Sequence, residues 1–314
     1  MTASGGALLD EAVAAALLPE RDPRGHKGTF GRVVAVAGSL DYAGAALMAG
    51  AAALRAGSGL VTLCVPAALQ PIIAGRVPEL ITRGLPEMAP FEVDADEAAA
   101  QVMALDAEAL LIGPGLAPGR ANSRLVRQVL AADGPTTVVD AGALDALAGL
   151  PRWWTRVERP LIVTPHPGEF ARLGREGGAG DGEARRLVAA EAAREWRAVV
   201  VLKGAHTVIA DADGRLLTAP FEVPALGSGG TGDVLAGIIA SLAGQGLAPF
   251  DAAALGVYLH ARAGEDLSSH LGDAGLMATD LLPAIPRVRR HLAVVRERAG
   301  GGRLGFEAPP GDST

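Results

Sequence analysis

Short apolar runs alternate along the chain with longer segments in which apolar residues recur at helical spacing. The apolar runs have the length and the Val, Ile and Leu content of strands that are buried on both faces. They cover residues 33–37, 60–65, 109–112, 136–140, 161–164 and 198–204. This alternation predicts an α/β fold with helices on both faces of a largely parallel sheet.

The helical segments and the turn signals complete this pattern. Helices are predicted over residues 9–17, 45–55, 123–130, 183–197, 251–267 and 278–298, and a hairpin over 207–218 turns at Asp213-Gly214. No linker interrupts the middle of the chain. We therefore expect one domain over residues 26–299, preceded by a helix and a loop in 1–25. The Gly- and Pro-rich tail at 300–314 is expected to be disordered.

Composition limits the classes of function. The 314 residues are 49% hydrophobic but only 4% aromatic, which predicts a large core of Ala, Val, Leu and Ile. The net charge of −7 offers no basic stripe for nucleic acid. With Cys64 as its single cysteine, the chain has no disulfide framework, and Cys64 is predicted to be a small buried residue. Neither a signal peptide nor a membrane-spanning run is visible, so a cytoplasmic location is expected.

A glycine-rich segment at residues 227–233, Gly-Ser-Gly-Gly-Thr-Gly-Asp, leads directly into an apolar helical pattern. The start of a helix presents unpaired N–H groups and a positive dipole end, and both suit an anion. Gly227, Gly229 and Gly232 also satisfy the dinucleotide-binding spacing. However, residues 220–224 contain two prolines and do not form a buried strand, so the context that this motif needs is missing.

Asp233 distinguishes this loop from a simple phosphate cradle, because its carboxylate would repel a phosphate. One interpretation makes Asp233 a general base that takes a proton from a hydroxyl attacking a phosphoryl group. The amides of Gly230, Thr231 and Gly232 would then hold the transferring charge. The other interpretation makes Asp233 only a helix cap. The loop alone leaves both open.

Further unusual sequences follow the predicted strands, and ligands of parallel sheets bind beyond the carboxyl ends of the strands. A glycine, a lone histidine or a lone lysine at one such position has an ordinary structural explanation. Several together at the same edge predict a binding site. They are Gly38-Ser39, residues 113–115, Asp140, residues 165–169, Lys203-Gly204 and the glycine-rich loop.

Five segments in order resemble the signature set of the NAD(P)H-hydrate dehydratases, which belong to the ribokinase-like superfamily. They are His-Lys-Gly-Thr-Phe-Gly at 26–31, Gly-Pro-Gly-Leu at 113–116, Thr-Pro-His-Pro-Gly-Glu at 164–169, Leu-Lys-Gly-Ala-His-Thr at 202–207 and Gly-Gly-Thr-Gly-Asp-Val-Leu-Ala-Gly at 229–237. The resemblance runs from about His26 to Leu282. It implies the ribokinase-like three-layer α/β/α sandwich.

The resemblance also implies a repair reaction. NADHX or NADPHX, the hydrated cofactors, would be phosphorylated on the hydrate hydroxyl by ADP, or by ATP as in eukaryotic members, and phosphate would then be eliminated to restore NADH or NADPH. Mg²⁺ would offset the phosphate charge. The resemblance further implies a homotetramer. Many bacterial members carry a fused NAD(P)H-hydrate epimerase domain; because about 25 residues precede His26 here, the epimerase is expected on a separate chain.

The roles of individual residues follow from the matching motifs. The resemblance makes Asp233 the base and places Gly230, Thr231 and Gly232 in the anion hole. Six residues are assigned to the nucleotide site: Lys203, Gly204, Ala205, His206, Thr207 and Gly232.

The remaining roles concern the hydrated dinucleotide and the metal. The resemblance assigns His166, together with Asp233, to contacts with the hydrated dinucleotide, while Gly115 and Ala45 leave room for it. Glu169 either holds Mg²⁺ through water or caps the following helix, and both interpretations stay open.

The chain departs from the family pattern at several positions. Asp140 matches the first acid of the family's Asp-Ala-Asp-Ala-Leu stretch, but Gly142 replaces the second, so no role is assigned to Asp140. Ala117 and Ser228 replace a glycine and a threonine, and neither change should abolish activity. Residues 223–225, Val-Pro-Ala, replace an asparagine that is common upstream of the glycine-rich loop, which puts local nucleotide contacts in question.

Two other functions are compatible with parts of this pattern. A vitamin-precursor kinase of the same superfamily would share the Gly-Thr-Gly-Asp sequence but would have no use for the His-Pro-Gly-Glu segment. A nucleotide sensor without turnover could keep the pocket, although an intact Asp233 argues against it.

Overall fold

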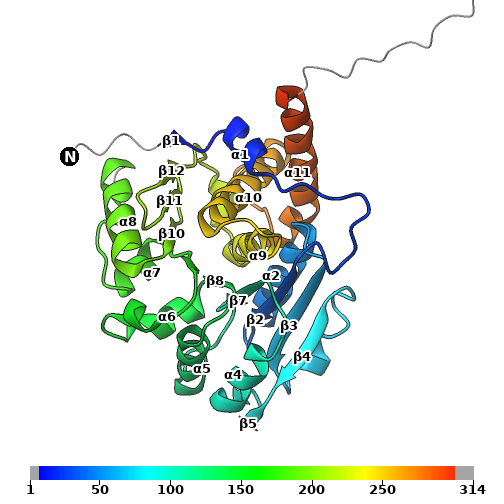
Figure 1. Cartoon of the computed structure of the whole chain (residues 1–314), viewed down its shortest axis with the longest axis vertical. Coiled ribbons are helices and arrows are strands. Elements are labelled where there is room, and N and C mark those ends of the chain that lie inside the picture. Colours follow the sequence, from blue (N-terminus) through cyan, green and yellow to red (C-terminus); the bar gives the residue numbers. More distant parts are fainter. Residues whose placement is uncertain (1–6, 181, 301–314) are drawn as a thin grey trace, which may run out of the picture.

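The computed structural model describes residues 7–180 and 182–300 and contains a ten-stranded central sheet (Figure 1). The order is β1-β12-β11-β10-β9-β8-β7-β2-β3-β4, and neighbouring strands are parallel except for the two pairs that β11 forms. The strands are β1 (Ala7–Leu8), β2 (Arg32–Val36), β3 (Leu60–Pro66), β4 (Ile81–Leu85), β7 (Ala109–Ile112), β8 (Thr136–Val139), β9 (Leu161–Val163), β10 (Val199–Leu202), β11 (Val208–Ala210) and β12 (Leu216–Thr218). The predicted, largely parallel α/β sheet is confirmed.

Helices cover both faces of the sheet, and each face has its own apolar core (Figure 1). Alternate residues of one strand enter different cores: Val33 and Ala35 face one, Val34 and Val36 the other. The first core is covered by α1 (Glu11–Leu17), α2 (Ala43–Arg55), α3 (Gln70–Ile73), α9 (Thr231–Gly244), α10 (Pro249–Leu271) and α11 (Ala278–Gly300). The second is covered by α4 (Ala95–Met103), α5 (Arg120–Ala131), α6 (Gly142–Ala148), α7 (Pro167–Arg172) and α8 (Gly182–Trp196).

Helix α9, which the glycine-rich loop precedes, is buried along almost its whole length. It contacts the strands β7, β8 and β2 on one side and the helices α2 and α10 on the other. A Cβ on Gly237 would overlap the Ala49 carbonyl oxygen, so only glycine allows α2 and α9 to approach this closely. This packing fixes the position of the helix start that the sequence singled out.

The sequence pattern missed several elements. The edge strand β4, the small hairpin of β5 (Glu87–Ala89) and β6 (Glu92–Val93), and the helices α4 and α6 were not predicted. In β4, exposed and half-buried residues alternate up to Leu85, so no continuous apolar run reveals the strand. The tail predicted to be disordered lies outside the described residues, apart from Gly300 at the end of α11.

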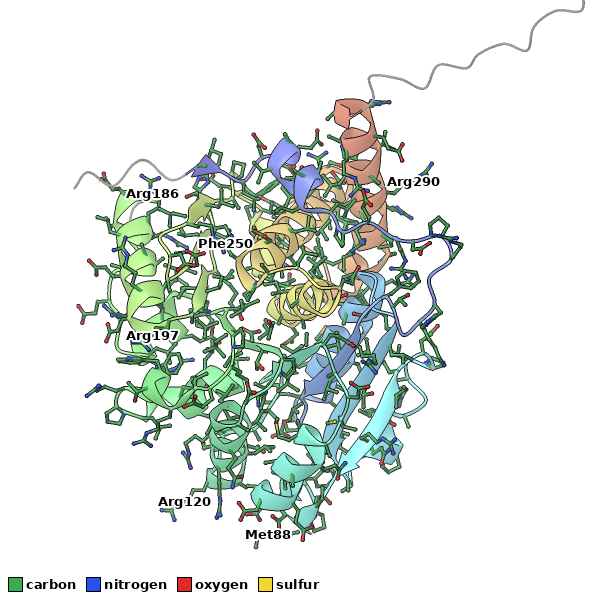
Figure 2. All side chains as sticks on the ribbon, in the orientation of Figure 1. Met88, Arg120, Arg186, Arg197, Phe250 and Arg290 are labelled. Atoms are coloured by element: carbon green, nitrogen blue, oxygen red, sulfur yellow. The ribbon has the colours of Figure 1, made fainter. Side chains whose placement is uncertain are left out.

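The surface is rich in charged side chains, whereas the layers are apolar (Figure 2). Arg120, Arg197 and Arg290 extend into solvent, while Phe250 lies inside, at the start of α10 (Figure 2). Cys64 is fully buried in β3, as predicted, and burial raises the pKa of its thiol to about 12. Within the described parts of the chain, none of the helices has both the length and the apolar character needed to cross a bilayer.

Candidate active site

Three neighbouring strands, β8, β9 and β10, end at the same edge of the sheet, and the residues that follow them form one hydrogen-bonded group. Asp140 follows β8, Thr164 follows β9 and Lys203 follows β10. The Asp140 Oδ1 atom accepts a hydrogen bond from the Lys203 ammonium at 2.7 Å and another from the Thr164 hydroxyl at 2.8 Å. The Asp140 side chain is 2% exposed and that of Lys203 is 17% exposed, so little water competes for this ion pair.

The segment after β9 forms a reciprocal cap at the start of α7. The His166 backbone N–H donates to Glu169 Oε2 at 2.7 Å. In return, His166 Nδ1 accepts hydrogen bonds from the backbone N–H groups of Gly168 at 3.0 Å and Glu169 at 3.3 Å. Glu169 Oε2 also lies 3.6 Å from the Lys203 ammonium. Glu169 therefore caps α7, as one of its two interpretations predicted, and is a second carboxylate beside Lys203.

The glycine-rich loop turns into α9 through a short 3₁₀ helix, η2 (Pro224–Gly227). Gly230 occupies the cap position with φ of +89°, a left-handed conformation that favours glycine. The Thr231 hydroxyl donates to two carbonyl oxygens, that of Leu226 at 2.7 Å and that of Ser228 at 3.0 Å. A Cβ on Gly232 would lie 3.5 Å from Lys203 Nζ. The start of α9 and the lysine ammonium are thus direct neighbours.

Asp233 is the third residue of α9, and the described structure gives it no capping hydrogen bond, since the cap position belongs to Gly230. The structure of the described residues therefore gives the capping interpretation of Asp233 no support. The pKa of the Asp233 carboxyl is raised to about 7, mainly by burial. The negative charges of Asp140 and Glu169 contribute to this rise, and the Lys203 ammonium opposes it. A carboxyl with this pKa can accept a proton near neutral pH.

Lys203 carries the positive charge of this cluster. Burial alone would lower the pKa of its ammonium, but the carboxylates of Asp140, Glu169 and Asp233 outweigh burial and raise the pKa above its ordinary value. Lys203 consequently stays protonated at neutral pH and is available to an anion. Three carboxylates face one ammonium, so the cluster has an excess of negative charge.

A cavity of about 700 Å³ opens beside this cluster. Its walls include five of the residues assigned to the nucleotide site, namely Lys203, Gly204, Ala205, Thr207 and Gly232, together with Thr231 and His166. His206 is not among the wall residues. Its backbone has φ of +53°, and its ring nitrogen Nε2 lies 2.6 Å from Glu222 Oε1.

The residues predicted to leave room for the dinucleotide lie outside the cavity wall but beside each other. A Cβ on Gly115, whose φ is +66°, would lie 2.8 Å from the Ala45 Cβ and 2.6 Å from the Tyr42 carbonyl oxygen. Met48 lies one turn further along α2 and packs equally closely against Gly230. A Cβ on Gly230 would lie 2.7 Å from the Met48 sulfur. The first turns of α2 therefore connect the loop around Gly115 with the start of α9.

Sequence reasoning noted Asp140 but assigned it no role, and it missed His260. His260, on α10, lines the cavity and its Nε2 atom lies 2.9 Å from the Thr231 carbonyl oxygen. Burial lowers the pKa of the His260 imidazole to about 4, so the ring is neutral, and the carbonyl partner requires the proton on Nε2. Nothing in the helical pattern of residues 251–267 marks His260. Asp140 did carry a signal, because it is an acid at the end of a buried strand.

The apolar part of the cavity was also not predicted. It is formed by Ala219, Phe221, Val223, Pro224, Leu226, Leu235, Val257 and Ala261. These residues come from the loop before α9 and from the helices α9 and α10. Residues 223–225, where the chain departs from the family pattern, therefore contribute to the cavity wall through Val223 and Pro224.

Comparisons with known proteins identify the family. A family model described as NAD(P)H-hydrate dehydratase matches residues 33–287. The chain belongs to the NAD(P)H-hydrate dehydratase family. This confirms the resemblance drawn from the five motifs.

Individual family members extend the comparison. A bifunctional NAD(P)H-hydrate repair enzyme of Moorella thermoacetica is 46% identical over 286 residues, which cover 91% of this chain but 54% of that protein. An ADP-dependent (S)-NAD(P)H-hydrate dehydratase of Xanthomonas campestris is 37% identical over 86% of this chain and 92% of its own length. The chain thus spans about half of the bifunctional relative and nearly all of the dehydratase.

A crystal structure of a family member has the same fold. The ADP/ATP-dependent NAD(P)H-hydrate dehydratase of Bacillus subtilis, co-crystallised with ATP and Mg²⁺, superimposes with a TM-score of 0.79 at 34% identity. The match covers 92% of this chain and all of that chain. The predicted ribokinase-like three-layer fold is confirmed.

Proposed function

We propose that this protein is an ADP-dependent (S)-NAD(P)H-hydrate dehydratase. The observation that carries the proposal is the position of Asp233. Its carboxyl has a pKa raised to about 7 and lies in the first turn of α9, where Gly232 adjoins the ammonium of Lys203. A proton acceptor beside an anion-binding helix start suits phosphoryl transfer to a hydroxyl. Family members of similar length carry this activity in their names.

The proposed reaction has two steps. The Asp233 carboxylate takes the proton of the hydrate hydroxyl while the hydroxyl oxygen bonds to the terminal phosphorus of ADP, and the bond from that phosphorus to the bridging oxygen breaks to release AMP. The lone pair of the ring nitrogen then expels the new phosphate group. Loss of a proton from the neighbouring ring carbon restores the double bond of NADH or NADPH. Phosphorylation is needed because hydroxide itself is a poor leaving group.

The two substrates are assigned to opposite sides of Asp233. ADP occupies the cavity, with its phosphates at Gly232 and Lys203 and its base against the apolar wall around Leu226 and Val257. The amides of Gly230, Thr231 and Gly232 stabilise the charge on the transferring group. The hydrated ring lies toward Ala45 and Gly115, where small residues meet. His166 lies on the cavity wall and contacts the hydrated dinucleotide where the two substrates meet.

Mg²⁺ fits this site as an ion held mainly by phosphate and water. No group of three or more possible protein ligands is found among the described residues, which argues against a cage made of side chains alone. The carboxylates of Asp140, Glu169 and Asp233 exceed the single charge of Lys203, so an additional cation is electrostatically favoured. Glu169 would hold the ion through water. When bound, Mg²⁺ supplies neutralisation of the phosphate charge.

The cellular setting of the proposed enzyme follows from the same assignment. We propose a single catalytic domain over residues 26–299 that acts in the cytoplasm as a homotetramer. Its functional partner is an NAD(P)H-hydrate epimerase, which would supply the (S) form of the hydrate. The relative of Moorella thermoacetica supports this pairing, because its name describes a bifunctional repair enzyme.

Product analysis tests the proposal against its rivals. The protein is incubated with NADHX or NADPHX, Mg²⁺ and either ADP or ATP, and the phosphorus-containing products are identified by NMR. The proposal predicts inorganic phosphate and AMP from ADP. A stable phosphate ester would instead indicate a small-molecule kinase. Nucleotide binding without turnover of the hydrate would indicate a sensor.

A further inference from the structure

The Lys203 side chain needs an anchor. Four rotatable bonds separate its ammonium from the backbone, yet the ammonium lies at a defined place beside Gly232. Two carboxylates are within ion-pairing distance. Asp140 Oδ1 is 2.7 Å away and hydrogen-bonded, whereas Glu169 Oε2 is 3.6 Å away and is already bonded to the His166 backbone. Asp140 is therefore the stronger anchor.

Asp140 is itself held in place by its surroundings. The Thr164 hydroxyl donates to the same Oδ1 atom that receives the ammonium. The Asp140 backbone is fixed as well, because a Cβ on Gly113 would overlap the Asp140 carbonyl oxygen and only glycine permits this approach. The next residue, Ala141, has φ of +47° and ψ of −121°, which is unfavourable for any residue with a side chain. Such strain is typical of sites whose geometry matters for function.

We propose that Asp140 is a positioning residue that holds the Lys203 ammonium against the phosphates of the bound nucleotide. The inference rests on the proposed function only in naming the nucleotide phosphate as the group that Lys203 contacts. Asp140 receives a role here although its neighbour Gly142 breaks the family pattern. The hydrogen bonds of Asp140 to Thr164 and Lys203 join the ends of three neighbouring strands, β8, β9 and β10.

A double-mutant cycle with Lys203 tests this role. The four proteins are the wild type, Asp140→Asn, Lys203→Met and the double variant, and the measured quantities are the dissociation constant of ADP, KM for ADP and kcat. We expect Asp140→Asn alone to lower kcat/KM for ADP by about 10- to 100-fold, the loss that is typical when the hydrogen-bonding partner of a metal ligand is removed. This loss should appear mainly as a higher KM and a higher dissociation constant for ADP, because the displaced Lys203 ammonium is the group that binds phosphate.

The double variant decides between positioning and a general structural effect. If Asp140 acts through Lys203, adding Asp140→Asn to Lys203→Met should change kcat/KM by less than about twofold, the range expected for an absent interaction. If the two losses multiply instead, Asp140 acts independently of Lys203 and the proposal is overturned. Thermal unfolding without ligand shows whether each variant is folded.

Two further variants keep the test decisive if Asp140→Asn does not fold. Thr164→Val removes one of the two donors to Asp140 but leaves its charge, and should cause a smaller loss that also disappears in the Lys203→Met background. Asp145→Asn is the matched control. Asp145 lies on α6, close in sequence, and pairs with Arg172 at the surface at 2.7 Å, so this variant should change none of the three quantities. An equal effect of Thr164→Val in both backgrounds would contradict the proposal.

The binding measurements separate this inference from the proposed function. If the wild type does not turn over the hydrate but binds ADP, the proposed function fails while the cycle on the dissociation constant still tests Asp140. If the wild type is active and the cycle is additive in all three quantities, the positioning role fails and the function stands.

Discussion

Gly230 lies directly against the thioether of Met48, so the loop that begins α9 rests on the first turns of α2. Two properties of Gly230 are needed here: its φ of +89° and its missing side chain. We expect Gly230→Ala to lower kcat/KM by roughly tenfold or more, because the left-handed conformation costs about 1 kcal/mol or more for alanine and the amides that we propose to bind the transferring phosphate would move. Steady-state kinetics and ADP binding measure the effect.

Gly229 provides the matched control for this prediction. No atom lies within 4 Å of a Cβ built on Gly229, and its backbone does not have positive φ. Gly229→Ala should therefore retain activity. Adding Met48→Ala to Gly230→Ala removes the overlap with the Met48 side chain but not the backbone strain. Equal activity of the Gly229 and Gly230 variants would show that the geometry of this loop does not control the reaction.

The raised pKa of Asp233 predicts the pH dependence of the reaction. A general base must be deprotonated, and the Asp233 carboxyl has a pKa of about 7 because of burial and of the charges on Asp140 and Glu169. We expect kcat/KM to be constant above pH ~8 and to fall tenfold per unit below pH ~6. The affinity for ADP, measured over the same range, controls for titration of the nucleotide itself. Activity that stays level down to pH ~5 would exclude Asp233 as the base.

The same shift predicts that Asp233 destabilises the folded protein at alkaline pH. An unfolded Asp has a pKa of about 3.9, whereas the folded carboxyl has a pKa of about 7. The stabilising contribution of the protonated carboxyl is thus fully present below pH ~4 and is lost as the pH rises through 7. The difference between the two pKa values corresponds to about 4 kcal/mol at most, so Asp233→Asn should raise Tm at pH ~8 by several °C and by less at pH ~5. Calorimetry at both values measures it, and a lower Tm at pH ~8 would contradict the assignment.

The sequence predicted the elements whose signals are local. Continuous apolar runs identified β2, β3, β7, β8, β9 and β10, and the glycine-rich loop identified the start of α9. The edge strand β4 has no such run, because one of its faces is exposed to solvent. The contact between Asp140 and Lys203 joins residues 63 positions apart. It depends on the order of strands in the sheet, and no local pattern encodes that order.

The close approach of Leu116 explains why glycine, and not the family's aspartate, occupies position 142. A Cβ at this position would overlap the Leu116 carbonyl oxygen and would lie 3.1 Å from the Leu116 Cβ. Restoring the acid of the family by Gly142→Asp should therefore destabilise the protein by about 1–3 kcal/mol, the usual cost of overpacking. Urea unfolding measures the change. Gly149→Asp is the control, since no atom lies within 4 Å of a Cβ there, and an equal effect of both changes would refute this explanation.

The central claim is that Asp233 activates the hydrate hydroxyl for phosphorylation by ADP. Asp233→Asn should lower kcat by about 10²- to 10⁴-fold, the usual contribution of a general base, while the dissociation constant of ADP changes little. Loss of ADP binding in this variant would place Asp233 in nucleotide binding and not in proton transfer.

The most direct test follows the dihydronicotinamide absorbance and the release of AMP together, in one reaction of the wild-type protein with NADHX, Mg²⁺ and ADP. Our account predicts that absorbance returns and that one AMP appears for each NADH restored, and that both signals are lost together in Asp233→Asn. AMP release without returning absorbance, with the phosphate retained on another alcohol, would contradict it.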